Sequence, residues 1–146
     1  MIRKYAEEDQ HALIDVWHAA SQVATPFLPA EFLAGEPDNI RNIYIPNAET
    51  WVFEAEDTVA GFIALIGNEV GAIFVHPKLQ GRGIGQALMD HAASLRDSLY
   101  LDVFKENAVG RHFYDRYGFR FESEHVHEQT GHWQIRLVFT PDQGVS

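Results

Sequence analysis

The sequence has 146 residues, of which 46% are hydrophobic, and we predict that residues 1–146 form one domain around a single core. Cysteine is absent, which excludes a disulfide framework, a thiolate metal site and a cysteine nucleophile. Eleven Lys and Arg residues against 21 Asp and Glu residues give a formal net charge of −10, which repels a phosphate backbone and attracts cations. We therefore expect no nucleic-acid partner and favour an amine substrate over an anionic one.

The first residues, MIRKYAEEDQHAL, lack the apolar core of a signal peptide, and no run of about 18 apolar residues occurs. We therefore expect a cytoplasmic protein with no membrane partner. Residues 1–5 read as a first strand, and the acidic residues 7–9 offer an N-cap for a helix. The stripe of Leu13, Val16, Trp17 and Ala20 predicts that this helix ends before Pro26.

Residues 25–47 hold four of the six prolines, which predicts a short second helix between constrained loops. Three β-like runs with short connections follow and indicate an antiparallel meander. The rest alternates between helical and β-like patterns, so we predict an α/β (α+β) fold, a mixed sheet with helices on both faces. The strands of the meander are expected at 50–56, 59–67 and 69–77, the later strands at 98–104, 119–127 and 132–139, and the later helices at 83–94 and 108–118.

Gly81, Gly83 and Gly85 alternate between the third strand of the meander and the helix that follows it. In this arrangement, successive backbone N–H groups and a helix N-terminus converge on an anion. Gln86 and Ala87 stand where a Walker loop needs Lys and Ser or Thr, and the spacing is not that of a dinucleotide loop. Taken alone, the three glycines fit a flexible structural turn equally well.

Two segments resemble the GNAT superfamily of N-acyltransferases. VHPKLQGRGIG, residues 75–85, is similar to its acyl-CoA pyrophosphate loop, and NAVGRHFYDRYGF, residues 107–119, is similar to its Asn-x-x-Ala-x-x-Phe-Tyr-x-x-x-Gly-Phe helix. The order of elements agrees with that fold, and both ends of the chain resemble the small bacterial YjaB-like subgroup. The resemblance implies a mostly antiparallel sheet of six to seven strands and about four helices. Gly110 departs from the motif, where Ala is usual, at a cost of about 1 kcal/mol in a helix interior.

The resemblance also implies a site. The backbone N–H of Ile73, or of Phe74 if a β-bulge lies there, would stabilise the oxyanion, and Val75 would pair with the pantetheine arm. Arg82 would contact a phosphate, and Asn107 would bind pantetheine unless it is only an N-cap. The acetyl-CoA-binding residues implied are Ile73, Phe74, Val75, Gln80, Gly81, Arg82, Gly83, Ile84, Gly85, Gln86 and Asn107.

Tyr114 matches the family's general acid, which protonates the departing thiolate; without the motif it would read as part of an aromatic stripe. Glu69 matches a general base used in part of the family, and strand alternation sets it on the side of Ile73 and Val75, within reach of the amine through water. His127, Glu54 and solvent are alternative bases. His125 and His127 suggest a metal pair, but no third ligand accompanies them, so no metal is expected.

These features predict an acetyl-CoA-dependent N-acetyltransferase that acts on a primary amine of a small molecule or peptide by direct transfer in a ternary complex. The alternative is a non-catalytic acyl-CoA sensor. A toxin that acetylates charged transfer RNA would share the chemistry, but the acidic net charge disfavours it. The choice of acceptor depends on residues 21–35 and the final hairpin, and the sequence does not specify how these two segments pack together. It is equally compatible with a monomer and a homodimer.

Overall fold

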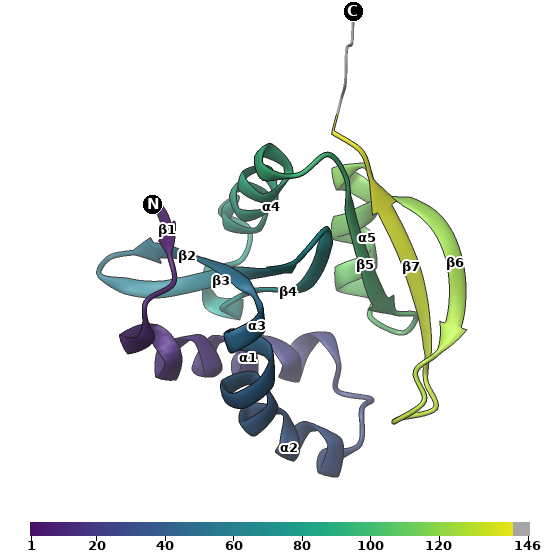
Figure 1. The fold of residues 1–146 in the computed structure, drawn as a ribbon. Coiled ribbons are helices and arrows are strands. Elements are labelled where there is room, and N and C mark those ends of the chain that lie inside the picture. The colour runs from purple at the N-terminus through teal and green to yellow at the C-terminus, as the bar shows by residue number, and fades with distance from the viewer. Residues whose placement is uncertain (142–146) are drawn as a thin grey trace, which may run out of the picture.

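The computed structural model describes residues 1–141, in which seven strands form one sheet (Figure 1). Neighbouring strands are antiparallel except for β4 and β5. The prediction of a mixed, mostly antiparallel sheet is confirmed. In the order β1-β2-β3-β4-β5-β7-β6, the strands are β1 Ile2–Lys4, β2 Glu49–Ala55, β3 Thr58–Ile66, β4 Glu69–Val75, β5 Leu99–Phe104, β7 Trp133–Phe139 and β6 Arg120–Val126.

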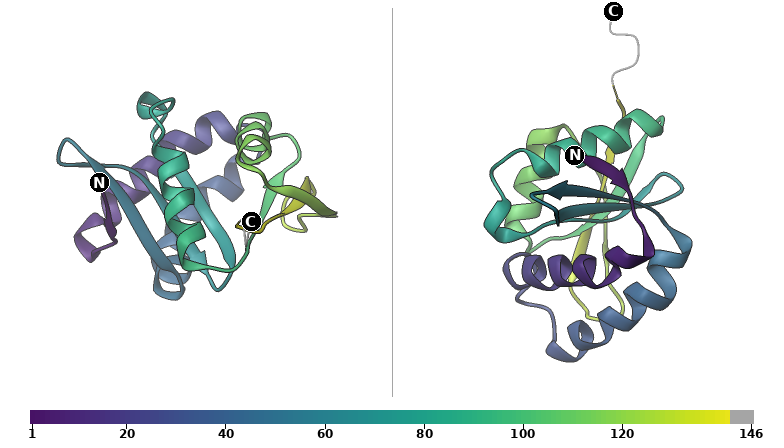
Figure 2. Two further views of the ribbon diagram at one scale, coloured as in Figure 1. Left: turned by 90° about the horizontal axis from the view of Figure 1, so that it is seen from above. Right: turned by 90° about the vertical axis from the view of Figure 1, so that its left-hand side faces the viewer.

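The helices cover both faces of the sheet (Figure 2). Leu13, Val16 and Trp17 of α1 pack on one face, and Leu88 and Met89 of α4 pack on the other. The 15-residue α1 ends before Pro26, as predicted. None of the helices within residues 1–141 is long and apolar enough to cross a membrane. The helices are α1 Gln10–Ala24, α2 Ala30–Asn39, α3 Ile45–Asn47, α4 Ile84–Leu95 and α5 Ala108–Tyr117, with single turns at Glu7–Asp9 and Pro77–Leu79.

The proline-rich segment is more helical than predicted. Instead of a short helix between loops, α2 continues through Pro37 into a π-helical turn at Ile40–Tyr44 and then into α3. Pro37 removes one helical N–H donor, and a π turn relaxes the backbone just beyond it. Ile40 is buried against the core beneath α1, and its burial offsets the lost hydrogen bond.

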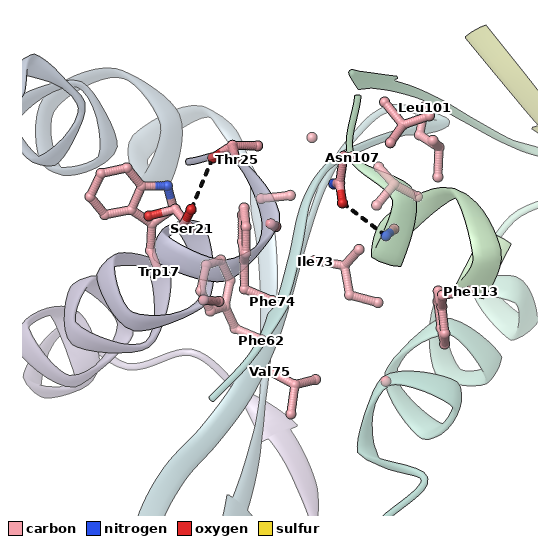
Figure 3. A pocket seen from close by; sticks show the side chains of 18 of the residues that line it. Trp17, Ser21, Thr25, Phe62, Ile73, Phe74, Val75, Leu101, Asn107 and Phe113 are labelled. Atoms are coloured by element: carbon pink, nitrogen blue, oxygen red, sulfur yellow. Dashed lines mark hydrogen bonds between the residues drawn. The ribbon is translucent and has the colours of Figure 1, made fainter. Parts of the chain in front are cut away.

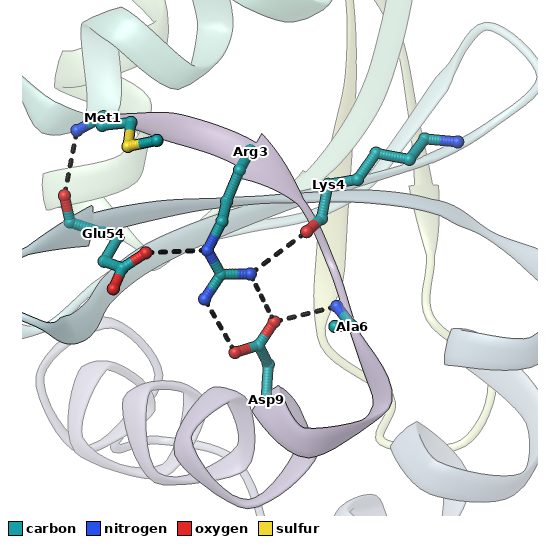
Figure 4. A network of polar contacts seen from close by, with 6 residues as sticks. All are labelled: Met1, Arg3, Lys4, Ala6, Asp9 and Glu54. Atoms are coloured by element: carbon teal, nitrogen blue, oxygen red, sulfur yellow. Dashed lines mark hydrogen bonds and ion pairs between the residues drawn. The ribbon is translucent and has the colours of Figure 1, made fainter.

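The acidic residues before α1 act differently from the prediction. The carboxylate of Asp9 makes no capping bond to α1; it accepts hydrogen bonds from Ala6 N–H at 2.8 Å and from two Arg3 nitrogens at 2.8 and 2.9 Å (Figure 4). Arg3 Nε also donates to Glu54 at 2.8 Å. Glu54 therefore joins β1 to β2 and is committed to an ion pair rather than free to act as a base.

A β-bulge in β4 changes which side chains share a face. Leu65 pairs with Val70 while Ala64 pairs with Ala72, so Gly71 is the extra residue. The bulge lies at Gly71 and not at Ile73 or Phe74. Because one extra residue reverses the alternation, Val70 shares the α4 face with Ile73, and Glu69 lies on the opposite face. The prediction that Glu69 shares a side with Ile73 and Val75 is therefore wrong.

Candidate active site

The site lies where β4 and β5 separate. These parallel strands share one register pair, Glu69 with Tyr100, at their amino-terminal ends, and beyond it they diverge. A pocket of about 640 Å³ occupies the gap. On the α5 side Leu101 and Tyr114 line it, and on the α1 side Trp17 and Phe32 do. The pocket therefore passes through the sheet and opens toward both faces.

The backbone of β4 directs polar groups into this gap. His76 N–H donates to Ala60 O at 2.8 Å, and the antiparallel alternation then directs Phe74 toward β3 and leaves Ile73 and Val75 facing β5. Consistent with this, Val75 O accepts a bond from the Gln80 side chain at 3.2 Å. Of the two predicted oxyanion donors, Ile73 N–H is the one that faces the gap.

Side-chain directions along β4 separate the two halves of the pocket. Ile73 and Val75 point toward α5, whereas Phe62 and Phe74 point toward α1 (Figure 3). The same division appears in the packing, since Ile73 and Val75 contact the α4-side core while Phe74 contacts the α1-side core. Each half of the pocket therefore has its own set of apolar walls.

The glycine loop brings backbone amides to the cofactor side. Gly81 and Gly83 have φ of +84° and +81°, a left-handed conformation that favours glycine. The Gly83 carbonyl accepts the Ala87 N–H at 3.0 Å, so the amides of residues 84–86 precede the first helical bond and lack helical acceptors. The loop has the geometry of an anion-binding helix start. Arg82, in contrast, is exposed and does not line the pocket.

The third glycine of the loop serves a different purpose. Gly85 has no positive φ, but a Cβ atom there would lie 3.3 Å from the ring of Phe113. Ile84 and Leu88 in the same helix are buried. Gly85 therefore allows α4 and α5 to approach closely at the edge of the pocket.

Asn107 begins α5 and lines the pocket. Its Oδ1 accepts the Gly110 N–H at 2.9 Å (Figure 3), so the predicted N-cap exists. A Cβ atom at position 110 would lie 2.6 Å from Asn107 Nδ2. The departure from the usual Ala therefore has a local reason, because glycine leaves room for the capping side chain.

Tyr114 lies one turn further along α5, between the rings of Phe113 at 5.5 Å and Phe119 at 5.6 Å. Burial raises the pKa of its phenol above the ordinary value of 10, so the hydroxyl is protonated at neutral pH. Tyr117 differs, since its hydroxyl donates to Asp90 of α4 at 2.7 Å. Of these two tyrosines, only Tyr114 lines the large pocket.

Glu69 is outside the pocket. Its carboxylate is bound by Arg136 through both terminal guanidinium nitrogens, and Arg136 also contacts Asp102 at 3.4 Å and Glu122 at 3.3 Å. This cluster joins β4 to β5, β6 and β7 at the closed end of the gap. The structure therefore does not bring Glu69 to the other predicted site residues, nor does it bring Glu54 there.

The connection from α1 to α2 and the start of α2 meet the final hairpin at the α1-side wall. The ring of Phe27 lies 5.2 Å from His132 and 5.9 Å from Phe104 of β5. The ring of Phe32 lies 5.5 Å from His127, which is itself 5.2 Å from Phe104. The two segments that the sequence could not relate therefore pack together, and Phe32 and His127 line the pocket where they meet.

Several pocket residues were missed by sequence reasoning. Asp102 alone carried a signal, because it is the one charged residue between the buried Leu101 and Val103 of β5. Within residues 1–141 no three His, Asp or Glu side chains are grouped so as to hold a metal ion. The missed polar residues are Ser21, Thr25, Glu36, Tyr44, Thr50, Asp102, Arg116 and Gln134.

Comparisons with known proteins point to one family. Residues 46–121 match the family described as an acetyltransferase (GNAT) domain. Peptidyl-lysine N-acetyltransferase YiaC from Escherichia coli is 32% identical over 120 residues, which cover 82% of each chain. Peptidyl-lysine N-acetyltransferase YjaB from the same organism is also 32% identical over 120 residues, covering 82% of this chain and 81% of YjaB.

Solved structures show the same fold. The solution structure of apo-form YjaB from Escherichia coli superposes with a TM-score of 0.85 at 27% identity, covering 95% of this chain and 96% of that one. PaiA N-acetyltransferase from Thermoplasma acidophilum, crystallised with coenzyme A, has a TM-score of 0.75 at 21% identity, covering 93% and 96%. The chain therefore belongs to the GNAT family of acetyltransferases and is an N-acetyltransferase.

Proposed function

We propose that the chain transfers the acetyl group of acetyl-CoA to the side-chain amine of lysine in a protein or peptide, directly and within a ternary complex. One observation carries this proposal: a single pocket passes through the gap between β4 and β5 and has a separate wall on each face of the sheet. Two substrates that enter from opposite faces meet in that gap.

On the α5 side, this chain's residues suit the donor substrate. The amides of residues 84–86 bind the pyrophosphate at the start of α4. Val75 bonds to the pantetheine arm through its backbone, and Asn107 adds its amide group, whose Nδ2 makes no hydrogen bond within residues 1–141. We assign phosphate binding to the loop backbone and not to the exposed Arg82 side chain.

The reaction needs a polarised carbonyl and a proton for the leaving sulfur. Ile73 N–H donates to the thioester oxygen as negative charge develops there. The neutral lysine amine attacks, the C–N bond forms, the C–S bond breaks, and Tyr114 donates its proton to the departing sulfur. The amide nitrogen then loses a proton, and Tyr114 regains a proton from solvent. The chain has no cysteine, which fits direct transfer without a thioester on the protein.

The α1 side suits a lysine side chain. Trp17, Phe62 and Phe74 provide an apolar wall for the aliphatic stem, while the carboxylates of Glu36 and Asp102 attract the cationic end. The net charge of −10 acts in the same direction. Both related Escherichia coli proteins are named as peptidyl-lysine N-acetyltransferases, which supports a peptide acceptor.

The test compares acceptors at equal concentration. A peptide with one lysine and a blocked N-terminus, the same peptide with lysine replaced by norleucine, and a panel of small primary amines are incubated with acetyl-CoA, and released thiol and product mass are measured. We expect acetylation of the lysine peptide with initial-rate lines that intersect in double-reciprocal plots. Faster acetylation of a small amine would refute the peptide acceptor, and parallel lines would refute the ternary complex.

A further inference from the structure

We propose that His127 is the general base, and that its Nε2 removes the proton from the lysine ammonium before the amine attacks. This inference rests on the proposed function and assigns a step that Glu69 and Glu54 are not placed to perform. His127 follows β6 and lines the pocket on the acceptor side.

The imidazole of His127 is held on two sides. Phe32 of α2 contacts it edge to face, with the ring centroids 5.5 Å apart and the planes at 83°. Phe104 of β5 does the same at 5.2 Å and 77°. Such aromatic pairs fix ring positions. Because Phe104 ends the strand that borders the gap, the imidazole is anchored to a wall of the site rather than to a free loop.

Thr130 engages one of the two nitrogens of the imidazole. Its Oγ1 lies 2.8 Å from His127 Nδ1, and its backbone N–H donates to His127 O at 3.2 Å. The turn at residues 127–130 therefore holds the Thr130 hydroxyl beside the imidazole. Oγ1 also accepts the His132 N–H at 3.4 Å. In the tautomer that we propose, Nδ1–H donates to Oγ1, and Nε2 is then the acceptor. Nε2 has no hydrogen-bond partner within residues 1–141. Thr130 is therefore a positioning residue.

The other proton acceptors of the pocket are less suitable. Glu36 accepts hydrogen bonds from Tyr44 at 3.2 Å and from Asn39 at 3.3 Å. Asp102 faces Arg136 at 3.4 Å and His125 at 3.9 Å. Both carboxylates are therefore engaged by other side chains, whereas no side chain within residues 1–141 engages Nε2 of His127, and imidazole is the side chain that most often serves as a general base.

No charged side chain competes for His127. Within residues 1–141, none of the charged or titratable side chains on α2, β5 and the hairpin makes an ion pair or hydrogen bond to the imidazole. The other charged or titratable groups on these elements are Glu31, Glu36 and Asp38 of α2, Tyr100 and Asp102 of β5, and Arg120, Glu122, Glu124, His125, Glu128, His132 and Arg136 of the hairpin.

The protons balance over the cycle. The lysine ammonium gives one proton to Nε2, which becomes part of an imidazolium and later releases it to solvent. Attack then proceeds as described above, so that one ammonium and one thioester yield one amide, one thiol and one proton. Lysine needs such a base because only roughly one amine in 2,500 is neutral at pH 7, whereas about one in nine is neutral at pH 9.5.

The experiment measures kcat/KM for the lysine peptide from pH 6 to 9.5 in wild type and in His127→Asn, which keeps a side-chain partner for Thr130 but lacks Nε2. We expect a loss of about 100-fold at pH 7 that shrinks to a few-fold at pH 9.5 as the amine becomes neutral on its own. His125→Gln, two residues away and outside the pocket, is the matched control and should follow the wild-type profile. Acetyl-CoA affinity and thermal midpoint, measured for each variant, verify folding.

A second pair of variants tests the positioning role. Thr130→Val should reproduce part of the loss with the same pH dependence, and Thr130→Ser should restore activity. An unchanged profile in His127→Asn, or a loss of equal size at every pH, would overturn the assignment of His127 while leaving the acetyl transfer itself intact. Absence of lysine acetylation by the wild type would instead refute the proposed function, and the assignment with it.

Discussion

Replacing Gly110 by Ala has two opposing effects of similar size on the free energy of unfolding. Alanine favours a helix over glycine by about 1 kcal/mol. Its Cβ, however, would lie 2.6 Å from Asn107 Nδ2, so the Asn107 side chain must leave the position in which it caps the Gly110 N–H at 2.9 Å. Loss of a cap costs typically about 1 kcal/mol. We therefore expect Gly110→Ala to change the free energy of unfolding by less than about 0.5 kcal/mol.

A double-mutant cycle isolates the coupling. In an Asn107→Ala background the cap is already absent, and Gly110→Ala should then stabilise the protein by the full increment of about 1 kcal/mol. Gly35→Ala is the control, because a Cβ atom at that helical position meets nothing within 4 Å, and it should give the same increment in either background. Urea unfolding followed by tryptophan fluorescence measures all six proteins. Equal stabilisation by Gly110→Ala in both backgrounds would refute the account.

Three further outcomes are expected. Hydrogen bonds from Arg3 and from the Ala6 N–H lower the pKa of Asp9 from its ordinary value of 3.8, against the opposing effect of burial, so Asp9 stabilises the fold above that value. Asp9→Asn should cost about 2 kcal/mol at pH 7 in urea unfolding, and the difference from wild type should narrow as the pH falls below 3.8. Gly83→Ala should weaken acetyl-CoA binding about tenfold in calorimetry, whereas Gly131→Ala, at a similar φ of +77° in the hairpin turn, should strain the backbone equally and leave the affinity unchanged. Glu69→Gln should keep kcat within about twofold across the pH range, since a removed base would cost at least about 100-fold.

The sequence was sufficient for those parts of the site that local motifs encode. The glycine loop, Asn107 and Tyr114 lie together around one pocket, as the spacing of the two motifs implied. Strand and helix positions followed from hydrophobic periodicity, since the buried stripe of α1 and the alternation in β5 match the observed burial.

Features that depend on pairing between distant segments were not predictable. The bulge at Gly71 is defined by the pairing of β4 with β3. It places Glu69 on the face opposite Ile73, away from the position that the predicted general base requires. The contacts of Phe32 and Phe104 with His127 join three elements that are far apart in the chain. Local patterns carry no information on such contacts, and this is why the acceptor side of the pocket became visible only in the structure.

The central claim is that Tyr114 protonates the leaving thiolate during acetyl transfer to lysine. The most direct measurement is the rate of thiol release with acetyl-CoA and the lysine peptide in wild type and in Tyr114→Phe, alongside the affinity of each for acetyl-CoA. We predict that kcat falls about 100-fold while the affinity changes little, because phenylalanine preserves the packing against Phe113 and Phe119. Equal kcat in the two proteins would contradict the role of Tyr114, and acetyl-CoA binding without any acetyl transfer by the wild type would favour a non-catalytic sensor.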